Sequence, residues 1–216
     1  MTASTQLIIF DWDGTLFDSV GQIVQSLQFA ATEFNLPLTD EAAKSIIGLG
    51  LPEVAQTLFP QVPELHDVIL KRYAEHYVEH SKDDRWFEGV AEMLYDLKAE
   101  GAQLAVATGK SRKGLDRVLA HTQSQDLFAV TRAASETRSK PHPQMLNEIL
   151  TTVQLSAHQA IMVGDTSYDL EMASHIQMPR VGVSYGVHEV DILSKFQPLT
   201  IAQDVETLHQ FLLKQL

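Results

Sequence analysis

Two aspartates, Asp11 and Asp13, directly follow the apolar run Leu7 to Phe10. A short apolar run bounded by a turn residue indicates a buried strand, which has little reason to end in two acids unless they do chemistry. Side chains two residues apart on an extended chain point to the same side, so both carboxylates should face one pocket. A simple turn explains Asp13 and Gly14, but it explains Asp11 less well.

More polar groups follow or separate the later apolar runs of the chain. They are Thr108, Gly109 and Lys110 after 104–107, Asp165 after 160–163 with Asp169 four residues on, and Lys140 between these two runs. In open parallel sheets, ligands bind beyond the carboxyl ends of the strands. If the runs are parallel strands, these side chains converge on one pocket.

Converging carboxylates need a positive charge among them. Two like charges about 4 Å apart repel by about 4 kcal/mol even at an effective dielectric of 20. Asp11, Asp13 and Asp165 form an oxygen-ligand set that suits Mg²⁺, which binds through a few carboxylates together with phosphate. Lys140 can supply a second positive charge, and Thr108 and the Gly109 amide can donate hydrogen bonds to phosphoryl oxygens. An anionic substrate is therefore expected rather than a neutral one, despite the acidic chain.

The residues after the first apolar run indicate helices only. Apolar residues recur at helical spacing from Val20 to Phe34, and Pro37 ends that helix. Thr39 can cap a second helix, while Pro52 and Pro63 can open two more. Residues from about 19 to 80 therefore predict roughly four helices and no strand.

From Gly89 onward, apolar strand-like runs alternate with helical patterns. Strands are predicted at 104–107, 128–130, 160–163 and 181–183, with helices between them and a last helix around 205–212. This alternation predicts an α/β fold with a doubly wound parallel sheet and helices on both faces. The helical stretch is then an insertion after the first strand, with residues 1–17 and 84–216 forming the core domain and 18–83 a helical domain.

The composition excludes several classes of protein. The chain of 216 residues has 16 basic and 28 acidic residues, a net charge of −12, so no nucleic-acid or anionic membrane surface is expected. It has no cysteine, which excludes disulfides and thiolate chemistry. The first apolar run is too short for a signal peptide or a membrane span, so we expect a cytoplasmic protein.

Four stretches of the chain together resemble the ordered motifs of the haloacid dehalogenase (HAD) superfamily. They are residues 11–19 (DWDGTLFDS), 106–110 (VATGK), 139–141 (SKP) and 163–169 (VGDTSYD). The resemblance runs from residue 8 to about residue 185 and implies a Rossmann-like core. The helical insertion, with its loop 47–51, is similar to the cap of the phosphoglycolate phosphatase-like branch.

This resemblance implies a role for each residue of the candidate site. Asp11 would be the nucleophile that forms an aspartyl-phosphate, and Asp13 the general acid and base. Mg²⁺ would bind the Asp11 carboxylate, the Asp13 main-chain carbonyl and Asp165. Lys140 would hold Asp11 and the phosphoryl group, and Asp169 would orient Lys140 or a metal-bound water. Thr108, Gly109 and Lys110 would bind the substrate.

Several functions share these motifs, and the sequence leaves them open. A phosphatase acting on a small phosphorylated metabolite, such as 2-phosphoglycolate, is the first. A β-phosphoglucomutase-like phosphomutase and a non-catalytic regulator that binds phosphorylated ligands are the alternatives. Asp13 disfavours dehalogenation, because the dehalogenases lack an acid at this position. The cap lysines, Lys44 and Lys71, lie in no stretch that resembles the Schiff-base site of phosphonatases. The oligomeric state, monomer or homodimer, is open.

A few conspicuous residues receive structural interpretations. Trp12 is expected to point away from the two acids into the core. Asp18 is expected to be the N-cap residue of the helix that follows it, with contact to the substrate as the alternative. His76 and His80 share one face of a helix, but no third metal ligand accompanies them. Hinges between the cap and the core are expected near 17–20 and 81–87.

Overall fold

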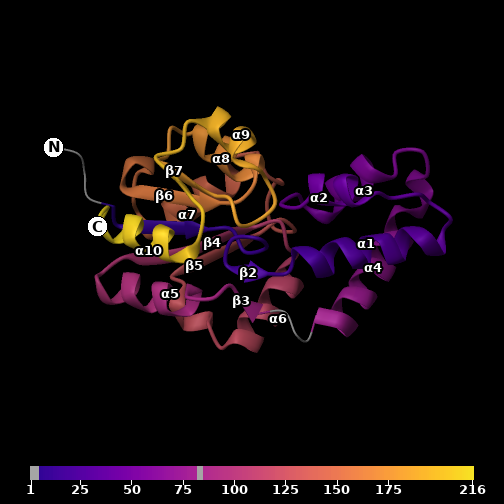
Figure 1. Ribbon diagram of the computed structural model, residues 1–216, viewed down its shortest axis with the longest axis horizontal. Helices are drawn as coiled ribbons and strands as arrows, with labels where there is room; N and C mark the ends of the chain where they lie inside the picture. Colours follow the sequence, from indigo (N-terminus) through magenta and orange to yellow (C-terminus); the bar gives the residue numbers. More distant parts are fainter. Residues whose placement is uncertain (1–4, 82–84) are drawn as a thin grey trace.

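The computed structural model describes residues 5–81 and 85–216. Within them, the main sheet has six parallel strands in the order β5-β4-β1-β6-β7-β8. The strands are β1 (Leu7–Phe10), β4 (Gln103–Thr108), β5 (Val130–Ala133), β6 (Ala160–Gly164), β7 (Arg180–Val183) and β8 (Ile201–Ala202). The predicted parallel α/β fold is confirmed, with the first strand of the chain at the centre of the sheet (Figure 1).

Both faces of the sheet are buried, as continuous apolar strands require. In β1, Ile8 and Phe10 pack into one core cluster, and Leu7 and Ile9 into the other. The first cluster includes residues of α5 (Val90–Ala99), α6 (Arg112–Thr122) and α10 (Val205–Leu213). The second includes residues of α7 (Gln144–Val153) and α8 (Ser167–Ser174). The sheet is therefore doubly wound, with the core divided into two layers.

The predicted helices between about 19 and 80 are present. They are α1 (Val20–Glu33), α2 (Asp40–Ser45), α3 (Leu51–Leu58) and α4 (His66–His80), with the short η1 (Pro63–Leu65) before α4. We call α1 to α4 the cap helices. They extend beyond one end of the sheet and pack on one another through apolar clusters of their own (Figure 1). Thr39 caps α2 as predicted, because its side chain accepts the Ala42 N–H.

The chain leaves and re-enters the core through two segments that pair with each other. β2 (Phe17–Asp18) and β3 (Arg85–Trp86) form an antiparallel ribbon. Trp86 contacts the rings of Trp12 and Phe17, with centroids 5.0 and 5.5 Å away. Trp12 is fully buried in the core, as predicted. The expected hinge at 17–20 includes β2, and the expected hinge at 81–87 includes β3. Residues 82–84 of the second hinge lie outside the described residues.

Two details of the prediction are wrong. Asp18 does not cap α1, because it is the exposed second residue of strand β2, and Ser19 occupies the N-cap position. The strand expected at 128–130 is β5 and starts at Val130, because Phe128 ends a short 3₁₀ helix, η3 (Gln125–Leu127), and packs against Trp12. The remaining short elements are η4 (Ala157–Gln159), α9 (Val190–Leu193) and η5 (Ser194–Phe196).

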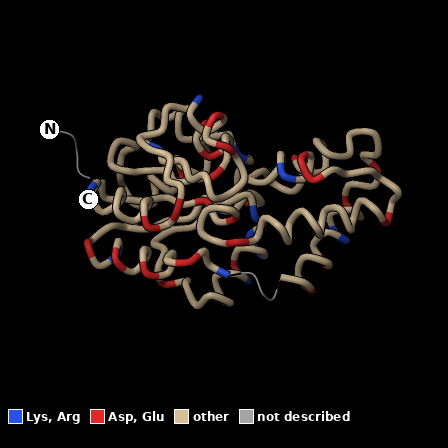
Figure 2. The backbone as a smooth tube through the Cα atoms, viewed as in Figure 1, with Lys and Arg blue, Asp and Glu red and all other residues tan. Residues whose placement is uncertain are grey.

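Charged residues follow no concentrated pattern. Figure 2 shows Lys and Arg scattered among more numerous acids, with no basic stripe along any element that it colours. In the described part of the chain, we find no helix with the length and apolar character needed to cross a membrane.

Candidate active site

The ends of three neighbouring strands bring the predicted residues together. Phe10 of β1 lies beside Val106 of β4 and Val163 of β6 in the parallel register. The Asp11 N–H extends this ladder by donating to the carbonyl of Val163 at 2.9 Å. Because the three strands end at the same edge, the residues that follow them share one site. The sheet topology thus explains why acids distant in sequence meet.

Lys140 lies between two buried carboxylates. Its Nζ is 2.8 Å from Oδ1 of Asp11 and donates to Oδ1 of Asp169 at 2.6 Å. Burial alone would lower the pKa of Lys140, but the two carboxylates outweigh it and raise this pKa. Lys140 is therefore a permanent cation that fixes the position of Asp11.

Asp169 is held from its other side by the start of its own helix. Oδ2 of Asp169 accepts hydrogen bonds from the backbone N–H and the hydroxyl of Thr166, at 3.1 and 2.7 Å. A Cβ added at Gly164 would lie 2.3 Å from Cβ of Asp169, so the strand must approach this side chain closely. Asp169 therefore bridges the start of α8 and the Lys140 ammonium.

Asp165 is enclosed by a loop that the sequence analysis did not single out. Its Oδ1 accepts from the Thr15 hydroxyl at 2.7 Å, and its Oδ2 from the Val187 N–H at 2.9 Å. A Cβ added at Gly14 or Gly186 would lie 2.3 or 2.4 Å from the Asp165 side chain. Burial, with Asp11 and Asp169 nearby, raises the pKa of Asp165 well above its usual range.

The site offers a set of oxygens that fits a divalent cation. Asp11, Asp165 and Asp169 each have a carboxylate oxygen within 4.8 Å of the others. Oδ2 of Asp11 is buried, and none of the described residues donates a hydrogen bond to it. Burial raises the pKa of Asp11 to about 7, against the opposing effect of Lys140. A buried acid without a donor is costly unless a cation joins it. The carboxylate of Asp13 lies outside this trio.

The carboxylate of Asp13 points instead toward the cap helices. Its Oδ1 accepts from the Ser19 hydroxyl at 2.5 Å, and Nζ of Lys110 is 2.8 Å away. Lys110 also lies over the ring of Tyr77, 5.0 Å from its centroid. Asp13 therefore stands between the buried acids and a lysine that touches α4.

Thr108 and Gly109 line the same edge. Thr108 is fully buried, and its hydroxyl oxygen accepts the Lys110 N–H at 3.2 Å, which leaves the hydroxyl proton able to point at a ligand. Gly109 faces the loop before α3, because an added Cβ would lie 2.6 Å from the carbonyl oxygens of Gly48 and Leu49. The predicted substrate-binding residues thus meet the loop that was expected to reach the site.

Two hydrogen bonds tie the end of α2 and the loop before α3 to the core. The Gly50 N–H donates to Oγ of Ser139 at 2.8 Å, next to Lys140. The Tyr168 hydroxyl donates to the carbonyl of Ser45 at 2.8 Å. The cap helices therefore rest on the two segments that also carry Lys140 and Asp169.

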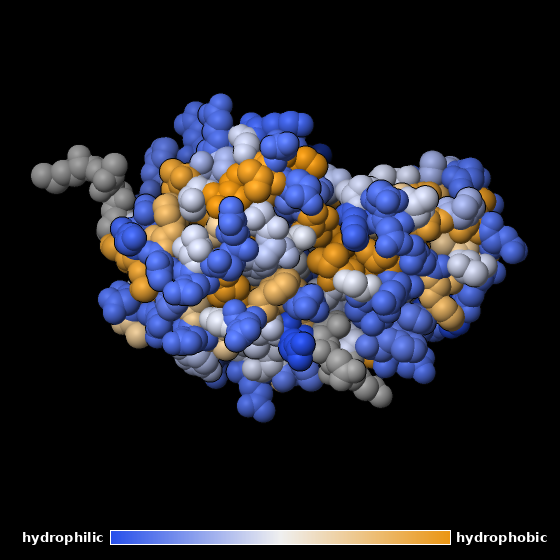
Figure 3. Space-filling view, viewed as in Figure 1, coloured by the Kyte–Doolittle hydropathy of each residue, from blue (hydrophilic) through white to orange (hydrophobic). Residues whose placement is uncertain are grey.

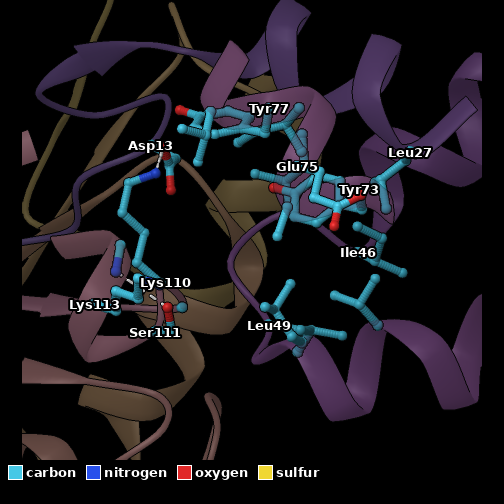
Figure 4. A pocket seen from close by; sticks show the side chains of 18 of the residues that line it. Asp13, Leu27, Ile46, Leu49, Tyr73, Glu75, Tyr77, Lys110, Ser111 and Lys113 are labelled. Carbon is cyan, nitrogen blue, oxygen red and sulfur yellow. Dashed lines mark hydrogen bonds and ion pairs between the residues drawn. The ribbon is translucent and has the colours of Figure 1, made fainter. Parts of the chain in front are cut away.

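A cavity of about 790 Å³ lies between the cap helices and the core. Its end at the core is lined by Asp13, Gly109 and Lys110. From there the cavity continues along α1, α3 and α4. Figure 4 shows Lys110 and Asp13 on one side and Leu27, Ile46 and Tyr73 on the other. The space is large enough for a whole metabolite next to Asp13.

The sequence analysis missed several residues that shape this site. They are Thr15, Ser19, Tyr77, Gly186 and Val187. Thr15 and Ser19 lie within the stretch that carries the two acids, and this position was the available signal. Tyr77 and the loop 184–188 carried none, because only the folded chain brings them to the site.

The fold and site together define an α/β protein with a doubly wound parallel sheet and a buried aspartate beside a lysine at its carboxyl edge. The model of the family described as haloacid dehalogenase-like hydrolase matches residues 8–183. The chain therefore belongs to the haloacid dehalogenase-like hydrolase family.

Named relatives agree with this assignment. The chain is 33% identical to the "Probable phosphatase IndB" of Dickeya dadantii over 90% of this chain and 88% of that protein. It is 29% identical to the "Phosphoglycolate phosphatase" of Vibrio cholerae, over 97% and 98% of the two chains. The crystal structure of a predicted phosphoglycolate phosphatase from Haemophilus somnus superposes with a TM-score of 0.86 at 26% identity, covering 96% of this chain and 97% of that one.

Proposed function

We propose that the chain is a Mg²⁺-dependent phosphatase that hydrolyses a phosphorylated metabolite through an aspartyl-phosphate on Asp11. The observation that carries this proposal is the Asp11 carboxylate. One oxygen is held by Lys140 at 2.8 Å, and the other is buried without a donor among the described residues. The phosphatase names of the relatives support the same reaction class.

The first half of the reaction transfers the phosphoryl group to Asp11. An oxygen of Asp11 attacks phosphorus, and the bond from phosphorus to the leaving alcohol breaks. Asp13 donates a proton to the leaving oxygen as general acid. Lys140 and the hydroxyl of Thr108 stabilise the negative charge on the phosphoryl oxygens.

The second half returns the enzyme to its starting state. Asp13 takes a proton from water, whose oxygen attacks the phosphorus of the aspartyl-phosphate. The bond between phosphorus and Asp11 breaks, and inorganic phosphate leaves. The same residue acts as acid and then as base, so the proton count balances over the cycle.

We assign the cation to Asp11 and Asp165, with the Asp13 carbonyl as a third ligand and Asp169 beside them. When bound, Mg²⁺ supplies positive charge that shields the carboxylates from the incoming phosphoryl group. The cap helices would exclude water from the site and contact the substrate. In this proposal, residues 18–83 act as a separate cap domain.

The test is phosphate release from a panel of phosphorylated metabolites that includes 2-phosphoglycolate. We expect release with Mg²⁺, none with EDTA, and a loss on the order of 10⁴-fold or more for Asp11→Asn. Asp191→Asn, on the short helix α9, is the matched control and keeps full activity. Release by Asp11→Asn at the wild-type rate would contradict the proposal. Transfer of the phosphoryl group to a sugar without phosphate release would indicate the mutase alternative.

A further inference from the structure

The cavity between the cap helices and the core has a charged end and an apolar end. The charged end consists of Asp13 and Lys110, with Lys113 and Arg117 of α6 beside them. The residues at the other end come from the cap helices and their loops, and we call them the apolar chamber: Ile23, Leu27, Ile46, Leu51, Val54 and Tyr73. Figure 4 shows the two groups on opposite sides, and Figure 3 shows apolar surface where the cap helices meet the core.

Three charged residues of α4 line the cavity, Lys71, Glu75 and Glu79, and the first two lie close to each other. Nζ of Lys71 is 4.0 Å from a carboxylate oxygen of Glu75, and Glu75 also pairs with Arg72. Burial raises the pKa of the Tyr73 hydroxyl, so this group stays neutral in the apolar chamber. The six side chains of the apolar chamber are therefore apolar or uncharged, although Lys71, Glu75 and Glu79 of α4 also line the cavity.

This arrangement selects among possible phosphate esters. The phosphoryl group takes the charged end, next to Asp13 and Lys110. A carboxylate that entered the apolar chamber would lose water and would find only the Tyr73 hydroxyl as a donor among the chamber side chains, which is unfavourable. A short acid such as 2-phosphoglycolate would also leave most of the 790 Å³ unfilled. The leaving alcohol that fits is one whose body is apolar.

We infer that this enzyme hydrolyses phosphate monoesters of alcohols with an apolar body, such as a hydrocarbon chain or ring, which occupies the apolar chamber. This inference rests on the proposed phosphatase function and adds the substrate class. Each methylene that leaves water for such a chamber gains roughly 0.8 kcal/mol, which corresponds to about a threefold to fourfold gain in kcat/KM.

The experiment compares straight-chain alkyl phosphates from methyl to hexyl with 2-phosphoglycolate, measured as phosphate release with Mg²⁺. The alcohols of this series have similar intrinsic reactivity, so a trend reports binding. We expect kcat/KM to rise by about threefold per methylene and hexyl phosphate to exceed 2-phosphoglycolate. A flat or falling series with release of phosphate would overturn the inference and leave the phosphatase proposal standing. No release from any compound would overturn the proposed function itself.

Variants show whether the chamber causes the trend. Leu51→Gln adds a polar group to the chamber, and Val78→Gln adds one to the cavity wall on α4, at a residue that is 48% exposed. We expect both to reduce the ratio of kcat/KM between hexyl and methyl phosphate at least tenfold, with unchanged thermal unfolding for Val78→Gln. Leu199→Gln, at a 54% exposed position outside the cavity lining, is the control and keeps the wild-type ratio. A wild-type ratio in both cavity variants would overturn the inference.

Discussion

Nζ of Lys110 lies 2.8 Å from Oδ1 of Asp13, so a cation rests on the proposed general acid. In the proposed reaction, Lys110 binds the incoming phosphoryl group while Asp13 faces the leaving oxygen. The first prediction is that Lys110→Met lowers kcat/KM for phosphate release on the order of 10²-fold, because one donor to the phosphoryl oxygens is lost. Steady-state kinetics on the best substrate of the panel measures this.

The control for this change is Lys44→Met. Lys44 is exposed on α2 and is not a cavity residue, so its loss removes a charge of the cap helices without touching the site. We expect wild-type kinetics. Equal effects of the two substitutions would mean that Lys110 acts only through net charge.

The second prediction concerns the buried ion pairs of Lys140. Lys140→Met leaves the carboxylates of Asp11 and Asp169 without their cation, which costs about 3–5 kcal/mol of unfolding free energy. Adding Asp11→Asn removes one of the stranded charges, so the double variant is expected to recover part of that loss. Urea unfolding of the single and double variants, both with EDTA, measures the coupling. Strict additivity would show that Lys140 and Asp11 do not interact.

The third prediction is a pH dependence of stability in metal-free protein. The pKa of Asp11 rises from 3.8 to about 7 on folding, so folding takes up a proton between these values. The stabilisation from this group is complete below about pH 4 and is lost as the pH rises through 7. Asp11→Asn lacks the titration, so its stability relative to wild type should increase by roughly 2 kcal/mol from about pH 5 to about pH 8. A difference that stays constant across this range would contradict the raised pKa.

The fourth prediction concerns metal binding without catalysis. Mg²⁺ at about 100 times its dissociation constant should stabilise the wild-type protein by about 2.7 kcal/mol. Asp165→Asn should show little of this gain, because Asp165 belongs to the buried trio. Asp191→Asn serves again as the matched control and should keep the whole gain. Thermal unfolding at increasing Mg²⁺ follows the effect, and an equal gain in both variants would place the cation elsewhere.

Much of the fold follows from local patterns that the chain displays openly. Apolar runs with no polar interruption predict the central strands, and helical spacing of apolar residues predicts the cap helices. Asp11, Thr108 and Asp165 could be placed together because each ends or directly follows a strand of a parallel sheet. The family resemblance, rather than spacing, assigned their separate roles.

Other features could not be predicted because they depend on contacts between distant segments. The ribbon of β2 and β3 has two residues in each strand, too few for any periodicity. The sequence pattern therefore wrongly predicts Asp18 as the N-cap residue of α1. Val187 contacts Asp165 only after β7 brings its loop beside β6. Tyr77 has the spacing of an ordinary core residue, and its place over Lys110 depends on how α4 packs against the core.

The last prediction concerns Gly109, at the closest approach of the core to the cap loop. A Cβ at this position would lie 2.6 Å from the carbonyl oxygens of Gly48 and Leu49, so Gly109→Ala has to push the loop away. Because the loop is tied next to Lys140 through Ser139, we expect kcat/KM to fall about tenfold or more. The control is Gly21→Ala on α1, where an added Cβ meets no atom of the described residues within 4 Å. It should keep wild-type kinetics and gain up to about 1 kcal/mol of stability from helix propensity. Wild-type activity in Gly109→Ala would show that this approach of the loop is not required for turnover.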